Sequence, residues 1–338
     1  MGRALADAAL LAAALRDPAT TASLDGDGWT ALIAMARAEQ LAGTLAHRLN
    51  GLDLPPVVAR MMEDARRSAE QGRIAALWEA EMARRALAPL GLPVVLLKGT
   101  AYVAAGLKAG VGRSIGDLDI LVPRATLDAV EAALLDAGWE WVKPDPYDDA
   151  YYRRWMHELP PLIHRDRDRM IDVHHTILPL TARPRPDAAA LIADAVPLNP
   201  GLGVLAPMDM IVHAAAHLFA DGDLAGGLRN LWDIHCLIEE FGSDGLVERA
   251  VHHGLAPYVA RAARLAHFLY GTPVPPPWCR LSAADPVYRA RLTARDGWGR
   301  ATRPALRQAF YLRSHLIRMP PLMLARHLWT KWRSGHRG

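Results

Sequence analysis

The residues best suited to chemistry in this chain are two carboxylates, Asp117 and Asp119, at the start of an apolar run. Side chains on a strand alternate between its faces, so both carboxylates are expected to point the same way. Such a pair repels unless cations lie between the acids, and Mg²⁺ is the usual occupant of oxygen sites beside phosphates. Paired ions lie about 3.5–4 Å apart and need further carboxylates. The expected third ligand is Asp172, the single acid in the apolar stretch 170–174.

Short strands must position these acids. The partly β-branched run Val94–Leu97 predicts a buried strand, and Leu118–Val122 predicts a second one that starts directly after Asp117. Two further apolar stretches flank the charged residues 165–169 and predict a hairpin. That hairpin would place Asp172 on a strand, as the metal-site hypothesis requires.

The order of these features resembles the nucleotidyltransferase superfamily of DNA polymerase β type. The segments LLKGTAY, GDLDILV and IDVHHTI, with an arginine before the second, more narrowly resemble a bacterial family known only as uncharacterised nucleotidyltransferases, over residues 91–180. Gly99–Thr100 stands where the superfamily usually has Gly-Ser or Gly-Gly, and Thr keeps a hydroxyl group. Gly116 stands where the narrow family often has Ser or Thr. Neither difference removes a predicted ligand.

The resemblance implies metal-dependent transfer of an NMP group from an NTP to a hydroxyl-type acceptor, with release of pyrophosphate. It implies that Asp117, Asp119 and Asp172 hold two Mg²⁺ ions, for which Mn²⁺ is a possible replacement. Asp172 would also accept the proton of the attacking hydroxyl. ATP is the expected donor. The acceptor is expected to be a small molecule or a protein, and the sequence does not identify it.

Lys98, Gly99 and Thr100 are expected beside the triphosphate. Glycine lets the backbone approach phosphate, and the following helix offers free N–H groups and a positive dipole end. Lys98 supplies charge, although an ion pair with one of the aspartates is an equally good expectation. Arg113 could bind phosphate through both arms of its guanidinium, and Ser114 is a weaker candidate.

Three further side chains, those of Tyr102, His157 and His174, are possible substrate contacts. His157 and its neighbour Glu158 lie near the predicted centre in sequence. His174 follows Asp172 by two residues and therefore shares its strand face, where it could orient a ligand carboxylate or contact substrate.

The predicted fold class is α+β. A nucleotidyltransferase core with a small mixed β-sheet, residues 89–180, would lie between an N-terminal helical cap, residues 1–88, and a C-terminal helical domain, residues 181–338. Apolar residues recur at helical spacing in both flanks. The last segment, residues 301–338, holds eight Lys or Arg and no acid. Because the whole chain has a net charge of +3, the residues before this segment have a net charge of −5.

The composition limits which binding partners and which cellular compartment are expected for this protein. The acidic body disfavours a nucleic-acid partner without excluding one, and the basic tail is expected to serve solubility. With two cysteines, a disulfide framework or a cysteine-based zinc site is not expected. There is no run of about 18 apolar residues, so we expect no spanning helix and a cytoplasmic protein.

Two other functions compete with the transferase. The first is a nucleotide-binding or regulatory module that keeps the fold without turnover. The second is a zinc hydrolase built on His213 and His217, four residues apart on a predicted helix. No third ligand is apparent for that second site.

Overall fold

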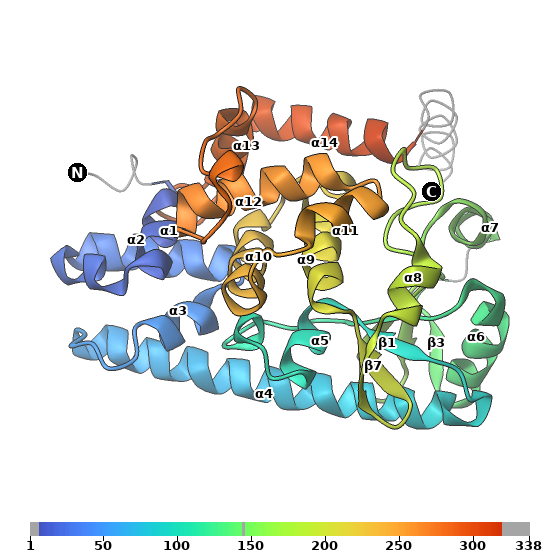
Figure 1. Ribbon diagram of the computed structural model, residues 1–338. Helices are drawn as coiled ribbons and strands as arrows, with labels where there is room; N and C mark the ends of the chain where they lie inside the picture. The colour runs from blue at the N-terminus through green and yellow to red at the C-terminus, as the bar shows by residue number, and fades with distance from the viewer. Residues whose placement is uncertain (1–6, 144–145, 320–338) are drawn as a thin grey trace, which may run out of the picture.

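The computed structural model describes residues 7–143 and 146–319 (Figure 1). These residues form a seven-stranded mixed sheet with helices before and after it, in the strand order β3-β4-β5-β2-β1-β7-β6. The strands are β1 (Val94–Leu96), β2 (Leu118–Leu121), β3 (Trp139–Trp141), β4 (Leu162–His164), β5 (Met170–His174), β6 (Val196–Asn199) and β7 (Leu202–Val204). The α+β class predicted from the sequence is confirmed.

The centre of the sheet is built from β5, β2, β1 and β7. β2 pairs with β5 and β1 pairs with β7 in parallel, whereas β1 and β2 run antiparallel. Every residue of β1 and β2 is buried, which explains why both read as continuous apolar runs interrupted only by Asp119. The predicted hairpin is confirmed as the antiparallel pair β4–β5.

The helices before β1 and those within the core wrap one end and one side of the sheet. They are α1 (Ala9–Arg16), α2 (Gly26–Ala38), α3 (Ala42–Arg48), α4 (Pro56–Leu87), α5 (Lys98–Ala104), α6 (Leu127–Asp136) and α7 (Pro146–Trp155). The long helix α4 packs against α3, α5, α6 and β2. It runs along the lower edge of the molecule in Figure 1.

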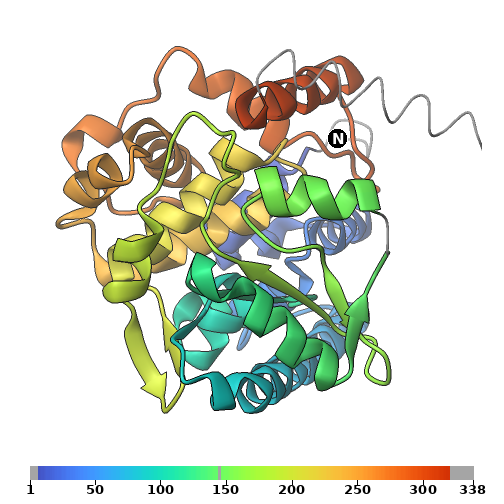
Figure 2. The same cartoon turned by 90° about the vertical axis from the view of Figure 1, so that its right-hand side faces the viewer.

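The helices that follow β5 lie mostly on the side of the sheet away from α4 (Figures 1 and 2). They are α8 (Ala188–Ala193), α9 (Pro207–Ala216), a π-helical turn (His217–Asp221), α10 (Gly227–Phe241), α11 (Leu246–His252), α12 (Ala256–Tyr270), α13 (Asp285–Leu292) and α14 (Pro304–Arg318). Short 3₁₀ turns lie at Pro18–Ser23, Ala88–Leu90, Lys108–Gly110, Arg124–Thr126 and Pro276–Trp278. In the described residues no helix has both the length and the apolar character needed to cross a membrane.

The sheet extends past the predicted end of the core. The sequence interpretation placed residues 181–338 in a helical domain, but β6 and β7 lie in that region and β7 pairs directly with β1. Helix α1 also packs against α12, and one hydrophobic core contains residues from all three predicted segments. The boundary at residue 180 therefore cuts through a sheet that both sides share. Whether the chain behaves as three domains stays a prediction.

A backbone contact joins the N-terminal helices to the loop before β2. Gly43 in α3 lies so close to Gly112 that a Cβ on either residue would overlap the backbone of the other. Gly112 also has a φ of +67°, which favours glycine. The contact fixes the position of the loop that leads to Asp117.

We expect Gly43→Ala to lower the melting temperature by several degrees, because its methyl group must displace the Gly112 backbone. Gly72→Ala is the matched control in α4, since a Cβ there meets nothing within 4 Å and alanine favours a helix interior by about 1 kcal/mol. Thermal unfolding followed by circular dichroism compares the two variants. Equal melting temperatures would contradict a tight contact at Gly43.

Candidate active site

The register of two parallel strands brings the predicted carboxylates together. Asp119 on β2 and Asp172 on β5 are direct cross-strand partners, so their side chains lie side by side on one face. Asp117 lies just before β2, and carboxylate oxygens of all three residues are within 4.8 Å of one another. Asp119 is buried, Asp172 is half-buried and Asp117 is exposed. The cluster is thus open to solvent at Asp117.

The surroundings of the cluster shift the pKa values of Asp119 and Asp172 in opposite directions. Burial opposes the ionisation of Asp119, but the Lys98 ammonium and the His174 imidazole outweigh burial and lower the pKa of Asp119 overall. Burial and the nearby charges of Asp119 and Glu158 raise the pKa of Asp172 to about 7. A bound cation would favour the ionised form of Asp172 and lower this pKa again.

Lys98 forms the ion pair that was one of its two expected roles. Its Nζ donates to Asp119 Oδ1 at 2.6 Å. Lys98 also begins α5 with a φ of +49°, an uncommon conformation for a residue with a side chain. Its ammonium therefore lies at the carboxylate cluster, between the helix start and β2.

Arg113 makes contacts within the protein that the sequence did not indicate. Its Nε donates to Asp233 Oδ2 at 3.0 Å, its guanidinium carbon is 5.6 Å from the centre of the Tyr102 ring, and all three side chains are buried. A Cβ on Gly99 would overlap the Arg113 guanidinium, so this glycine makes room for an arginine. Pairing over 120 residues leaves no local pattern, so the sequence did not connect Arg113 with Asp233.

Thr100 and Ser114 differ in their surroundings. Thr100 is buried near the start of α5, and its Oγ1 has no hydrogen-bond partner among the described residues. Ser114 is exposed in the loop before Asp117. Ser114 is thus accessible to a ligand, whereas the Thr100 hydroxyl is covered, and the nucleotide-binding roles of both stay predictions.

His157, Glu158 and His174 lie against the carboxylates. His174 Nε2 is 3.0 Å from Asp119 Oδ1, while its Nδ1 is 3.3 Å from Glu158 Oε2. The His157 and His174 rings lie with their centres 5.2 Å apart, and both are buried. His174 therefore orients a candidate ligand carboxylate, one of the two roles expected for it. Glu158 was noted only for its place in the sequence.

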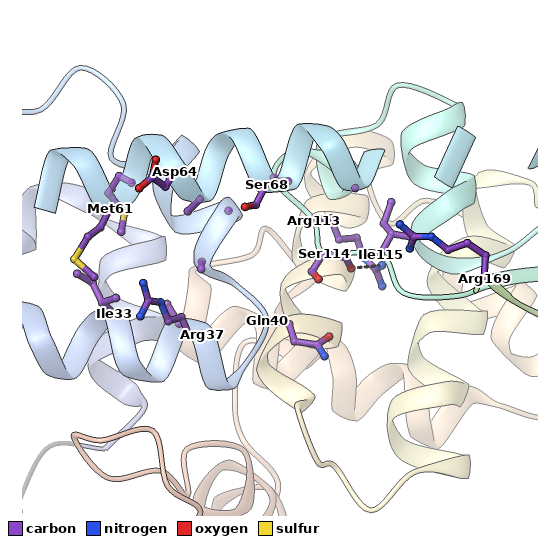
Figure 3. A pocket seen from close by; sticks show the side chains of 18 residues that line it. Ile33, Arg37, Gln40, Met61, Asp64, Ser68, Arg113, Ser114, Ile115 and Arg169 are labelled. Atoms are coloured by element: carbon purple, nitrogen blue, oxygen red, sulfur yellow. Dashed lines mark hydrogen bonds between the residues drawn. The ribbon is translucent and has the colours of Figure 1, made fainter. Parts of the chain in front are cut away.

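A cavity of about 480 Å³ opens beside the loop 112–115 (Figure 3). It lies between α2, α4 and this loop, and we call it the α2–α4 cavity. Ile33 and Met61 lie at one end, while Ser114 and Ile115 lie at the other. Its remaining polar or charged lining side chains are Arg37, Gln40, Asp64, Ser68, Arg113 and Arg169.

The α2–α4 cavity leads toward the carboxylates. Ile115 and Arg169 line both this cavity and a small depression that contains Asp117. Among the residues that the structure describes, the guanidinium groups of Arg37 and Arg169 have no hydrogen bond or ion pair. The cavity thus offers the guanidinium groups of Arg37 and Arg169, and Arg169 also lines the depression that contains Asp117.

The candidate site lies within a segment of the chain that matches a known protein family. A family described as uncharacterised nucleotidyltransferases matches residues 25–271. The chain belongs to this family. The match includes α2 to α12 and thus every residue of the candidate site. A comparison with curated proteins finds no match. The family places the chain among the nucleotidyltransferases and leaves its donor and acceptor open.

The zinc hydrolase on His213 and His217 gains no support. His213 lies on α9 and His217 begins the π-helical turn after it. Within residues 7–143 and 146–319, the groups of three or more potential ligands are the three aspartates and the set His157, Glu158 and His174. A third ligand for this rival site is therefore missing from the described residues.

Asp172 makes the metal-free protein less stable at alkaline pH. Its pKa is about 7 in the folded protein and about 4 in the unfolded chain, so folding stability falls as the pH rises from about 4 to about 7. Without metal, Asp172→Asn should therefore raise the melting temperature at pH 8 and change it little at pH 5. Asp166→Asn in an exposed turn is the control. A pH-independent effect of Asp172→Asn would contradict the raised pKa.

Proposed function

We propose that this protein transfers an NMP group from a magnesium-bound NTP, expected to be ATP, to the hydroxyl of a small molecule and releases pyrophosphate. The observation that carries the proposal is the in-register pair Asp119–Asp172, with Asp117 close enough to share ions with both. Membership of a nucleotidyltransferase family supports the reaction type.

The donor set fits two divalent cations. The three ligand side chains offer only carboxylate oxygens, which Mg²⁺ and Mn²⁺ prefer. Burial and the neighbouring charges of Asp119 and Glu158 raise the pKa of Asp172, and divalent cations would offset both effects. Bound there, the ions would neutralise charge on the phosphates and on the attacking oxygen.

The protein's own residues would supply position, charge and a base. The Lys98 ammonium, released from Asp119 as cations bind, would contact the phosphates together with the start of α5. Asp172 would take the proton of the acceptor hydroxyl, a role that suits a carboxylate beside the attacking oxygen. The acceptor oxygen bonds to the α-phosphorus as the bond to the β-phosphate oxygen breaks, and pyrophosphate leaves.

The α2–α4 cavity supports a small-molecule acceptor over a protein. Its volume of about 480 Å³ falls within the range of about 300–1,000 Å³ typical of small-ligand sites. The free guanidinium groups of Arg37 and Arg169 favour an acceptor with an acidic group, and Ile33 and Met61 favour one with an apolar part.

One observation favours the alternative, a binding or regulatory module without turnover. Both cations predicted to meet phosphate are already paired, Lys98 with Asp119 and Arg113 with Asp233. The Arg113 pair is buried and costly to break. Such a module would bind Mg-NTP and release no pyrophosphate.

Asp119→Asn should abolish magnesium-dependent NTP binding, because it removes a buried ligand and the partner of Lys98. Calorimetric titration of each Mg-NTP into wild type and variant measures this, with Asp136→Asn on α6 as an exposed-acid control. We expect the affinity for Mg-NTP to fall more than about 100-fold in Asp119→Asn and to stay unchanged in Asp136→Asn. Any slow release of pyrophosphate seen with the wild type should also be lost in Asp119→Asn. No NTP binding by the wild type would overturn the proposal, and binding without pyrophosphate release would favour the module.

Ser68→Trp should block the α2–α4 cavity while leaving Mg-NTP binding intact. The assay follows transfer of label from α-phosphate-labelled NTP to the small molecules of a bacterial extract. We expect labelled product with wild type and with Gln71→Trp, an exposed control on α4 that does not line the cavity, but not with Ser68→Trp. Equal transfer by both tryptophan variants would place the acceptor elsewhere.

A further inference from the structure

A second group of potential metal ligands, distinct from the three aspartates, consists of His157, Glu158 and His174. Regular backbone pairing holds it together. Glu158 and His174 form an antiparallel bridge, and the N–H of His175 donates to the carbonyl of His157 at 2.8 Å. The segment that follows α7 is therefore fixed against the end of β5, which sets the positions of all three side chains.

The ligand atoms are spaced as a metal ion would space them. Glu158 Oε2 lies 3.3 Å from His174 Nδ1 and 3.7 Å from His157 Nε2. A four-coordinate ion with bonds of about 2.0–2.2 Å holds neighbouring ligand atoms roughly 3.3–3.6 Å apart. The two distances from Glu158 are close to this spacing, and ligand atoms of all three residues lie within 4.8 Å of one another. A fourth position would be left for water or another ligand.

Two buried ring nitrogens of this group lack a hydrogen bond. His174 is 2% exposed and His157 is 8% exposed, and the Nδ1 atom of each has no hydrogen-bond partner among the described residues. A buried polar atom without a partner is costly, and most such atoms in native proteins meet a protein group, a water or an ion. Of these two atoms, His174 Nδ1 is the proposed ligand, because it lies 3.3 Å from Glu158 Oε2, whereas His157 presents its Nε2 to the same carboxylate.

Asp119 supplies the second partner that metal-bound histidines usually have. His174 Nε2 lies 3.0 Å from Asp119 Oδ1, so a proton on Nε2 leaves Nδ1 as a lone pair aimed at Glu158. A carboxylate that fixes the opposite nitrogen orients the ring and strengthens the metal bond.

We propose that His157, Glu158 and His174 bind one transition-metal ion, with Zn²⁺ as the expected occupant. Two imidazoles and one carboxylate suit zinc and its neighbours, whereas the all-oxygen aspartate cluster suits Mg²⁺. The ion would act as a positioning element, since it holds the imidazole that orients Asp119. This inference depends on ligand geometry and does not require the proposed transfer reaction.

The site without a metal would be held differently. A doubly protonated His174 would then bridge Asp119 and Glu158 as a buried cation, and transition metals would bind no more tightly than at any surface histidine. The two arrangements differ in one measurable property, which is stoichiometric binding of a transition metal by imidazole nitrogen.

The test titrates Co²⁺ into full-length protein that has been stripped with EDTA and desalted, in the presence of excess Mg²⁺ to occupy the carboxylates. We expect one equivalent to bind, with visible absorption bands of low-symmetry cobalt, and Zn²⁺ to displace it. X-ray absorption of the zinc-loaded wild type should show two imidazole ligands. This measurement does not depend on the folding of any variant.

Near-isosteric variants assign the ion to this group. Glu158→Gln and His157→Gln should each weaken Co²⁺ binding more than about tenfold. Asp117→Asn, which alters the carboxylate cluster, and His217→Gln, which alters the other histidine pair, should leave it unchanged. Circular dichroism confirms that each variant is folded.

Three outcomes would overturn the proposal. They are no saturable binding by the wild type in excess Mg²⁺, binding that is unaffected by both Glu158→Gln and His157→Gln, and an X-ray absorption spectrum without imidazole. Loss of Co²⁺ binding in Asp117→Asn would instead assign the ion to the aspartates. If Co²⁺ binds as expected but no NTP does, the zinc site stands while the proposed transferase function fails.

Discussion

The parallel pairing of β2 with β5 is the constraint on which the rest of the site depends. It places Asp119 directly beside Asp172 on a mostly buried sheet, where two carboxylates cannot both ionise without positive charge nearby. Lys98 and His174 supply part of that positive charge, since both contact Asp119. The pKa of Asp172 nevertheless stays raised. The partial burial of Asp172 makes the remaining imbalance larger, although the cluster stays open to solvent at Asp117.

Local patterns predicted the strands that carry the acids and missed what lies far apart in sequence. Asp117, Asp119 and Asp172 were found because a single acid in an apolar run and a spacing of two are visible in the sequence. β6 and β7 were missed because strands of three or four residues leave little periodicity, and β7 owes its place to its pairing with β1. The Arg113–Asp233 pair, the α2–α4 cavity and the direction of Glu158 arise from tertiary packing.

Arg113 shows how one residue can serve two demands. Its buried ion pair with Asp233 ties the loop before β2 to α10, and the missing side chain of Gly99 gives it room. The same arginine lines the α2–α4 cavity. A ligand in that cavity would therefore meet a surface whose shape is set by the C-terminal helices, although most of its lining residues come from α2 and α4.

The packing of α1 against α12 has a consequence for how the molecule unfolds. Helices from the two ends of the described chain share one core, and the sheet lies between the segments that contribute them. Neither group of helices can separate without exposing apolar surface on the other. Fluctuations that open α1 would therefore also loosen α12. The loop that leads to Asp117 is anchored at Gly43, so its local stability would depend on contacts that lie far from it.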